Sequence, residues 1–445
     1  MNASKLPSQQ ILIIGGGTAG WMAATLLAHS WGQKHGVKIT LMESSTIGTI
    51  GVGEGSTPKM RRFFNRIGVP EHEWMPACNA TYKCGISFPG WSVKRGYTSY
   101  YHPFFTLSDE QFIEPFWHNL RLRQAENLDV HAHPDAFFVS RYLAASRRAP
   151  LSSAPNSYET DYAYHFDASL IGQLLKDRAM ALGVRHIVDT VTAVNRAENG
   201  DIASVDTQTN GTLAADLFVD CSGFASLLIQ RALEVPFISY ADHLFNDRAV
   251  ALPSPPDNNG TLASETRSIA MKHGWAWKIP LTNRYGNGYV YSSDYCDAEQ
   301  AESELRELTG IHDKSVEARH LKMRVGRVAR SWDRNCLSVG LSQGFIEPLE
   351  ATALMTVQET LEWFIEQYEK DDFTDRGRDS LNHRLNGLFD GIRDYVYMHF
   401  KLNSRSDTRY WNDCRQTQLP SVVVKDILTT WDAGGDMVEL LKSLK

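Results

Sequence analysis

A glycine-rich turn near the N-terminus carries the clearest chemical signal in the chain. Gly15, Gly17 and Gly20 have the spacing G-x-G-x-x-G, after the apolar run 11–14 and before a helix-like segment that begins at Trp21. In such a turn the first glycine permits the bend, the second lets the backbone approach a pyrophosphate, and the third allows close strand–helix packing. The helix N-terminus then faces the phosphates. The pattern therefore predicts a dinucleotide site, in preference to a purely structural glycine turn.

An acidic residue supports the same interpretation. Glu43 ends a second apolar strand, residues 37–42, and lies 23 residues after Gly20. That position suits a carboxylate that accepts hydrogen bonds from an adenosine ribose. Thr18 and Ala19, inside the glycine turn, are expected to contact the cofactor as well.

A second glycine-rich loop follows at residues 51–58. Gly51 and Gly53 begin it, and three glycines within five residues favour close approach of the backbone to a ligand. A flexible surface loop uses the same residue types, so this alternative stays open.

Two lysines could serve catalysis, and the local pattern does not rank them. Lys59 opens a short helix-like segment that stops at Gly68, and Lys83 lies in the mostly small and apolar stretch 79–88. Because lysines mostly lie on surfaces, neither is favoured for a functional role on composition alone.

Two aromatic features and one helix start complete the candidates. Trp275 and Trp277 are two residues apart and lie on one face of an expected strand, where a core pair would also explain them. An aromatic cluster at 100–105 could line a pocket or fill a core. An expected strand at 335–341 leads through an acidic, proline-containing segment into a helix over 354–368, whose N-terminal N–H groups could hold an anion.

Bulk composition excludes several classes of function. The 445 residues carry a net charge of −7, so no basic field points to nucleic acid or to anionic lipid. The six cysteines are scattered without metal-type spacing, which favours free thiols in a reducing cytoplasm and no metal. Too few residues precede the first strand for a signal peptide, and no stretch approaches the 18 or so apolar residues of a membrane span.

The strands that must position these residues predict an α/β fold. Further strands are expected at 185–188 and 202–205, and the segment 217–224 is expected to be a buried strand that ends in a turn of small residues. A helix at 168–175 has Asp167 as its expected N-cap. The segment 231–295 alternates apolar and polar residues and is expected to add antiparallel strands. In a doubly wound sheet, the turns at the carboxyl ends of the strands line the ligand crevice.

Taken together and in order, these landmarks resemble the flavin-dependent halogenases of the tryptophan halogenase type. The resemblance runs from Ile11 to Trp411, and its most specific part is Trp275-x-Trp277-x-Ile279-Pro280, which matches the family signature W-x-W-x-I-P. It implies an FAD-binding Rossmann-type lobe, like that of glutathione reductase and the aromatic hydroxylases, with an antiparallel sheet and a helical substrate lobe. The expected FAD-binding lobe covers residues 1–90 and 155–365, and the expected substrate-side lobe covers 91–154 and 366–445.

The resemblance also assigns roles to single residues. The glycine turn, Glu43, the 51–58 loop, Asp220 and Gly340 match the family's FAD-binding parts. Segment 80–88 matches the one that holds the family's catalytic lysine, so Lys83 takes that role and Lys59 does not. Segment 345–350 aligns with the P-L-E-S-T-G block, which makes Glu350 the catalytic glutamate. The resemblance places the halide on the N–H groups of Thr352 and Ala353, and His102 and Phe104 on the substrate side.

The implied reaction needs FADH2 from a separate flavin reductase, O2, and chloride or bromide. Hypohalous acid forms and halogenates an electron-rich aromatic molecule after Lys83 has held and aimed it. Glu350 is expected to orient Lys83 and to take up the proton that the ring loses. The resemblance leaves a homodimer open.

Two departures from the family pattern leave the ligands open. The family block reads Glu-Ser-Thr-Gly, whereas this chain has Ala351 and Ala353, so bromide competes with chloride as the expected halide. Much of the C-terminal region with which free-tryptophan halogenases hold the amino acid's backbone has no obvious counterpart before Lys445. An indole or a phenol is therefore as plausible a substrate as tryptophan.

Two rival functions share part of these features. A single-component FAD-dependent aromatic hydroxylase would consume NAD(P)H without a partner reductase and would not need Lys83. A flavin-binding protein without halogenating activity would bind FAD and yield no halogenated product.

Overall fold

The computed structural model of the chain describes residues 9–32, 36–45, 53–104, 109–126, 128–151, 160–257 and 260–444. These residues form two compact units. The first comprises Met1–Ala80, Phe166–Tyr240 and Met323–Gly391, and the second comprises Thr81–His165, Ala241–Lys322 and Ile392–Lys445. The lobes expected from the sequence place residues 241–322 with the nucleotide-binding strands, whereas the structure groups them with the second unit. The division of ligand contacts between the two expected lobes stays a prediction.

The first unit is built on a six-stranded sheet in the order β20-β21-β12-β1-β2-β8. Every neighbouring pair is parallel except β20 and β21. The residues of β12 are all buried, as are those of β1 after its first residue. Such continuous apolar strands are typical of a parallel sheet covered on both faces, and they confirm the expected α/β class. The strand bounds are Gln10–Ile14 for β1, Lys38–Glu43 for β2, Arg185–Val188 for β8, Leu217–Asp220 for β12, Trp332–Asp333 for β20 and Cys336–Ser338 for β21.

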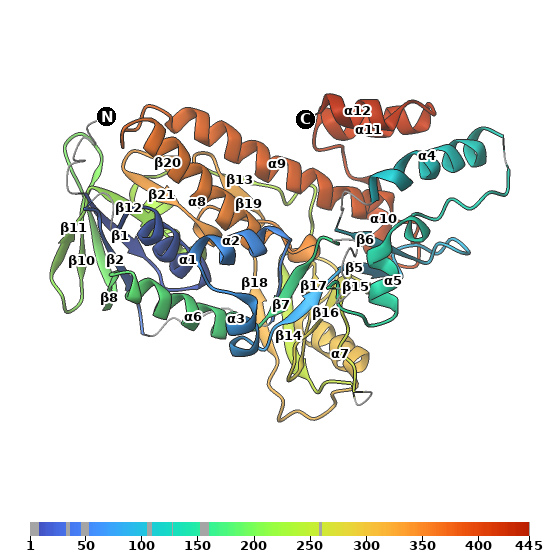
Figure 1. The fold of residues 1–445 in the computed structure, drawn as a ribbon, viewed down its shortest axis with the longest axis horizontal. Helices are drawn as coiled ribbons and strands as arrows, with labels where there is room; N and C mark the ends of the chain where they lie inside the picture. Colours follow the sequence, from blue (N-terminus) through green and yellow to red (C-terminus); the bar gives the residue numbers. More distant parts are fainter. Residues whose placement is uncertain are drawn as a thin grey trace. The chain divides into compact units, whose positions relative to one another are not determined.

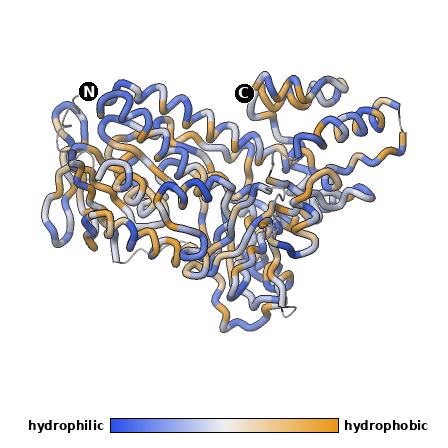
Figure 2. Tube along the Cα trace, viewed as in Figure 1, coloured by the Kyte–Doolittle hydropathy of each residue, from blue (hydrophilic) through white to orange (hydrophobic). Residues whose placement is uncertain are grey.

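Three helices pack beside this sheet. Helix α1, Thr18–Leu27, is buried from Gly20 to its end and contacts both α6, Ala168–Ala181, and α8, Ala353–Lys370 (Figure 1). Asp167 caps α6 as expected, because its carboxylate accepts the N–H groups of Ser169 at 2.9 Å and Leu170 at 3.3 Å. Figure 2 shows hydrophobic residues along the strands of this region.

Smaller elements complete the first unit. Two three-stranded sheets also belong to this unit. The first consists of β9 Val191–Arg196, β10 Ile202–Thr207 and β11 Thr212–Ala214, and the second consists of β13 Phe237–Ser239, β19 Gly326–Val328 and β22 Gly344–Phe345. The remaining elements are β3 Glu54–Gly55, α2 Lys59–Ile67, α3 Glu71–Ala77, the short helices η1 Ala28–Gly32, η4 Gly223–Ala225, η5 Leu227–Ala232, η6 Gly340–Ser342 and η7 Pro348–Glu350, and α9 Arg378–Leu402, which ends in the second unit.

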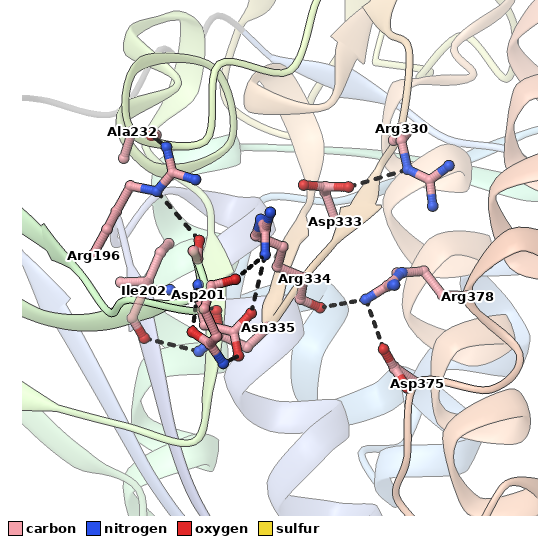
Figure 3. A network of polar contacts seen from close by, with 12 residues as sticks. Arg196, Asp201, Ile202, Ala232, Arg330, Asp333, Arg334, Asn335, Asp375 and Arg378 are labelled. Atoms are coloured by element: carbon pink, nitrogen blue, oxygen red, sulfur yellow. Dashed lines mark hydrogen bonds and ion pairs between the residues drawn. The ribbon is translucent and has the colours of Figure 1, made fainter.

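A polar network fixes the chain just before β21. The Asn335 side chain accepts the backbone N–H of Ile202 at 2.9 Å and donates to the carbonyl of the same residue at 2.9 Å (Figure 3). Arg334 donates to the carbonyl of Asn199 at 2.6 Å, and its own carbonyl accepts Arg378 at 3.4 Å. These bonds hold β10 and the start of α9 against the residues that precede β21. Gly340 follows the same strand.

The second unit is built on a seven-stranded sheet in the order β18-β14-β17-β16-β15-β5-β6. Only the β15–β5 pair is parallel among the pairs described. The antiparallel strands expected within residues 231–295 are confirmed. The strand bounds are Gly85–Pro89 for β5, Ser99–Pro103 for β6, Arg248–Ser254 for β14, Thr266–Ala270 for β15, Gly274–Pro280 for β16, Tyr285–Tyr291 for β17 and Arg319–Lys322 for β18.

One further strand pair belongs to this unit. Strand β4, Thr81–Lys83, pairs antiparallel with β7, Ala163–Phe166. The helices of the unit are α4 Glu110–Ala125, η3 Pro134–Phe137, α5 Val139–Ala145, α7 Ala298–Thr309, α10 Arg409–Gln416, α11 Val422–Asp432 and α12 Met437–Ser443. Among the described residues, no helix is both long and apolar enough to cross a membrane. The same part of the chain contains no group of three His, Cys, Asp or Glu side chains placed to hold a metal ion.

Candidate functional site

The glycine turn has the geometry that its sequence predicts. Gly15 has φ +111° and donates its N–H to the carbonyl of Met42 at 2.8 Å. A Cβ on Gly15 would overlap the carbonyl of Cys221, and one on Gly20 would overlap the carbonyl of Gly15. At Gly17, by contrast, no atom of the described residues lies within 4 Å of an added Cβ. The backbone is therefore closely packed on one side of the turn and open at Gly17, where α1 begins.

The start of α1 can bind an anionic group. Gly17 is the N-cap and offers no side-chain cap. The first N–H groups of a helix have no partner within the helix, so a phosphate can accept them in the favourable field of the helix dipole. Thr18 and Ala19 form the first turn of α1, and their contact with the cofactor stays a prediction.

Glu43 lies against the glycine turn, where a Cβ on Gly16 would overlap its carboxylate. Its Oε1 is 2.8 Å from Nε2 of His186 and accepts Nζ of Lys176 at 3.2 Å. The two partners follow Glu43 by 143 and 133 residues, so nothing in the local sequence pointed to them. They hold the carboxylate at the carboxyl end of β2, where a ribose would meet it.

Asp220 shapes the neighbouring turn. It is fully buried, and its carboxylate accepts the N–H groups of Ser222, Leu228 and Ile229 at 2.8–3.0 Å and the Ser222 hydroxyl. Burial raises the pKa of Asp220 above its ordinary value, and the hydrogen bonds oppose that rise. The bonds give Asp220 a role inside the protein, and a direct contact with the cofactor stays a prediction.

The turns at the strand ends converge on α1. Gly340 has φ +74°, and a Cβ on it would lie 2.7 Å from the Cβ of Ala19. Together with the approach of Cys221 to Gly15, this closeness brings the turns after β1, β12 and β21 together, as expected for the ligand crevice of such a sheet. Gly53 has φ +91°, whereas Gly51 lies outside the described residues. A glycine-lined cradle with an open helix start and an adjacent carboxylate fits the ADP part of FAD.

Glu350 belongs to the first unit and lies at the end of η7, just before α8. Glu350 is only 5% exposed, and the next residue, Ala351, has φ +55°, in the left-handed region. The chain then enters α8, whose N-cap, Thr352, makes no side-chain capping bond. The N–H groups of Thr352 and Ala353 thus lie at a helix start with a favourable dipole for an anion such as a halide. The expected helix over 354–368 is confirmed as α8.

Lys83 is the most unusual residue of the second unit because its side chain is completely buried. Its Nζ lies 5.4 Å from the centroid of the Phe104 ring, so two predicted site residues are close together. The competing lysine, Lys59, is more exposed and forms an ion pair with Glu359. Since lysines are rarely buried without a reason, the structure supports a functional role for Lys83 over Lys59.

The tryptophan pair lies on one face of β16, as expected. Both side chains are buried, and their ring centroids are 6.2 Å apart with a tilt of 57°. Across the sheet, Gly288 faces Trp277, and a Cβ on that glycine would overlap the indole. The buried indole N–H of Trp277 has no hydrogen-bond partner among the residues that the structure describes, which leaves a donor for a ligand.

His102 joins an aromatic group at the C-terminal part of α9. Its Nδ1 is 2.9 Å from the hydroxyl of Tyr395, and the neighbouring Tyr100 hydroxyl is 2.6 Å from Nδ1 of His399. Phe88 stacks on Tyr100, with ring centroids 4.7 Å apart. Sequence reasoning named His102 but missed its partners on α9, because helical aromatics carry no sign of which strand they will contact.

The comparisons with known proteins cover nearly the whole chain. The model of the family described as tryptophan halogenase matches residues 10–444. The tryptophan 6-halogenase of Streptomyces toxytricini is 39% identical over 439 residues, which are 94% of this chain and 83% of that protein. The tryptophan 7-halogenase of Lentzea aerocolonigenes is 38% identical over 424 residues, covering 92% and 79%. The solved structure of a flavin-dependent halogenase from Brevundimonas sp. BAL3 superposes with a TM-score of 0.84 at 33% identity, covering 96% of this chain and 84% of that chain.

Proposed function

Because the chain belongs to the tryptophan halogenase family, whose solved relatives include flavin-dependent halogenases, we propose that it halogenates an electron-rich aromatic molecule through Lys83. The observation that carries this proposal is the complete burial of Lys83 beside the ring of Phe104. Burying an ammonium group costs on the order of several kcal/mol of desolvation free energy. Proteins tolerate this cost mainly where the charge serves a function.

The glycine turn, Glu43 and the turns of Gly53 and Gly340 would hold FAD. When bound and reduced, FAD would supply two of the four electrons that reduce O2, and the halide would supply the other two. One O2, one halide, one proton and FADH2 then give hypohalous acid, water and FAD. A separate flavin reductase would deliver the FADH2, and we place the reaction in the cytoplasm, where such reductases have NADH.

The helix start at Thr352 and Ala353 would bind the halide before oxidation. This site offers backbone N–H donors and a helix dipole, and it does not require a cationic side chain. Both chloride and bromide suit such donors, and Ala353 adds a methyl group at the position where the family block has glycine.

Lys83 would hold hypohalous acid by hydrogen bonding from its ammonium group and present the halogen to the ring. The ring carbon takes the halogen, the hydroxide leaves as water with a proton, and the ring loses its own proton. Glu350 is the proposed acceptor of that ring proton. Burial of Lys83 keeps bulk water away from a reactive electrophile.

The relatives point to an indole ring as the substrate. Both curated relatives are named for halogenation of tryptophan, at carbon 6 and at carbon 7. We therefore propose a tryptophan or another indole as substrate class, with phenols as the comparison.

Mass spectrometry tests the proposal directly. The enzyme is incubated with FAD, a flavin reductase, NADH, chloride or bromide, and separately tryptophan, indole and a phenol, with catalase present to remove free peroxide. We expect a halogenated indole product, identified by its isotope pattern, that is absent without the reductase. A hydroxylated product with NADH consumed in the absence of reductase would instead establish the single-component hydroxylase, and FAD binding without any product would establish a non-catalytic flavin protein.

A further inference from the structure

A continuous chain of buried hydrogen bonds runs through the second unit beside Lys83. Nε2 of His165 is 2.9 Å from the hydroxyl oxygen of Thr266, and its Nδ1 is 2.9 Å from the hydroxyl oxygen of Thr81. The Thr81 hydroxyl in turn donates to the carbonyl of Pro280 at 2.7 Å. His165 is completely buried, and both threonines are at most 5% exposed. The chain thus links β15, β7, β4 and the last residue of β16.

The direction of these bonds determines the tautomer of His165. A threonine hydroxyl has one hydrogen, and that of Thr81 is used on the Pro280 carbonyl. Thr81 can therefore only accept from His165, so Nδ1 carries the imidazole hydrogen. A neutral ring then has its lone pair on Nε2, which accepts the hydroxyl hydrogen of Thr266.

The ring is held neutral by its surroundings. Burial, with the positive charge of Lys83 as a second cause, lowers the pKa of His165 well below its ordinary value. The neutral form satisfies both ring nitrogens with the two threonines, so no buried polar atom of the imidazole is left over.

Strand geometry places His165 on the same face as the lysine. Thr81 is directly opposite His165 in the antiparallel β4–β7 pair, and Lys83 is opposite Ala163. Lys83 is two residues after Thr81, and alternate residues of a strand point to one face. His165, Thr81 and Lys83 therefore share a face, and the bond from Nδ1 ends on the strand that carries the lysine.

We propose that His165 is a positioning residue of the halogenation reaction, which fixes β4 through its Nδ1–H bond to Thr81 and thereby sets the position of the Lys83 side chain. The inference rests on the proposed function of Lys83. The bond from Thr81 to Pro280 extends this control to the end of the W-x-W-x-I-P strand, so the lysine and the tryptophan motif are held by one network. A histidine that merely filled the core would act through its volume, and the two ring nitrogens would not differ in importance.

Two matched amide variants separate these cases. In His165→Asn the side-chain amide occupies the place of Nδ1 and can still donate to Thr81, whereas in His165→Gln it occupies the place of Nε2 and keeps only the Thr266 side. The measurement is halogenated product per FADH2 oxidised, with thermal unfolding recorded for each variant. We expect halogenated product per FADH2 oxidised to fall about ten- to hundredfold in His165→Gln and to stay near the wild-type value in His165→Asn. The rate of flavin oxidation should be unchanged in both variants. Equal losses in the two variants would overturn the proposal.

A second pair covers the case in which the histidine variants do not fold. Thr81→Ser keeps the hydroxyl, and Thr81→Val keeps the shape but cannot donate to Pro280. We expect product per FADH2 to fall in Thr81→Val and to be restored in Thr81→Ser. A Thr81→Val enzyme with the wild-type ratio would overturn the proposal.

The tautomer supplies a readout that does not depend on activity. The protein has 15 histidines, and the His165 signal in a 15N-histidine NMR spectrum is assigned by its loss in the variants. We expect a neutral ring with hydrogen on Nδ1 across pH 6–8. An imidazolium signal or hydrogen on Nε2 would overturn the network, whereas wild-type enzyme that makes no halogenated product would refute the proposed function and leave this signal unchanged.

Discussion

At the scale of single residues, the candidate site depends on side chains placed where their type is uncommon. The Lys83 side chain is completely buried, and Ala351 has a left-handed backbone conformation with φ +55°. The first position concentrates a charge where an electrophile would be held. The second turns the chain sharply between Glu350 and Thr352, which is the N-cap of α8.

The strain at Ala351 predicts the effect of a glycine there. A non-glycine residue in the left-handed region costs about 1–2 kcal/mol, whereas glycine loses roughly 0.5–1 kcal/mol of backbone entropy on folding. We expect Ala351→Gly to raise the free energy of unfolding by about 0.5–1 kcal/mol, measured by urea denaturation. A destabilised variant would show that the methyl group of Ala351 makes packing contacts worth more than the strain.

Gly288 is predicted to set the place of Trp277. Because a Cβ at this glycine would overlap the indole, Gly288→Ala should displace the ring and lower the unfolding free energy by about 1–3 kcal/mol. Gly172→Ala is the matched control, since nothing in the described residues lies near its added methyl group and alanine favours a helix by about 1 kcal/mol. A Gly288→Ala protein with wild-type stability and tryptophan fluorescence would contradict this packing.

At the scale of elements, the strands around His165 predict a pH dependence of stability. The folded protein holds the pKa of His165 below its ordinary value, so the unfolded chain binds more protons below about pH 6.5. Stability is then fully present above that pH and is lost as the pH falls, by up to about 1.4 kcal/mol per pH unit from this group.

Removing the imidazole should remove that loss. We expect the stability of His165→Gln to fall less steeply between pH 6.5 and pH 5 than that of the wild type, measured by urea denaturation at each pH. His273, whose pKa is also lowered by burial, contributes equally to both proteins and cancels in the comparison. Parallel curves for the two proteins would show that His165 is not held neutral.

The elements themselves were largely predictable, and the long-range partners were not. The strand–turn–helix around Gly15, the cap at Asp167 and the helix after Glu350 follow from local rules of periodicity, glycine geometry and capping. The partners of Glu43 and the role of His165 depend on pairing between strands far apart in the chain, which one sequence does not reveal. The local pattern did not rank Lys59 and Lys83, and the family resemblance favoured Lys83; its complete burial, which supports that choice, depends on the fold.

At the scale of the whole molecule, the proposed reaction draws residues from both compact units. The nucleotide turn, Glu350 and the helix start of α8 belong to the first unit, and Lys83, Phe104 and the tryptophan pair belong to the second. In the proposed reaction the two groups would have distinct tasks, because the first would make hypohalous acid and the second would hold it for the substrate.

Variants of Glu350 test whether this residue serves the transfer of the halogen to the substrate. Glu350→Gln keeps the size of the buried side chain and removes its charge, so we expect halogenation to fall by about 10²–10⁴-fold, as for loss of a proton acceptor, while FAD still binds. If Glu350 and Lys83 serve the same step, Glu350→Gln should still form hypohalous acid at the wild-type rate, as is expected of Lys83→Ala. Wild-type turnover in Glu350→Gln would remove the residue from the mechanism.

The central claim is that Lys83 transfers the halogen without taking part in its oxidation. The most direct measurement follows two products in one reaction of the Lys83→Ala enzyme, namely the halogenated indole and the hypohalous acid captured by a soluble thioether. Lys83→Met serves as the matched variant that keeps the apolar part of the buried side chain. We predict that both variants oxidise FADH2 and form hypohalous acid at the wild-type rate but yield no halogenated indole. Halogenated indole at near the wild-type level from either variant would contradict the account.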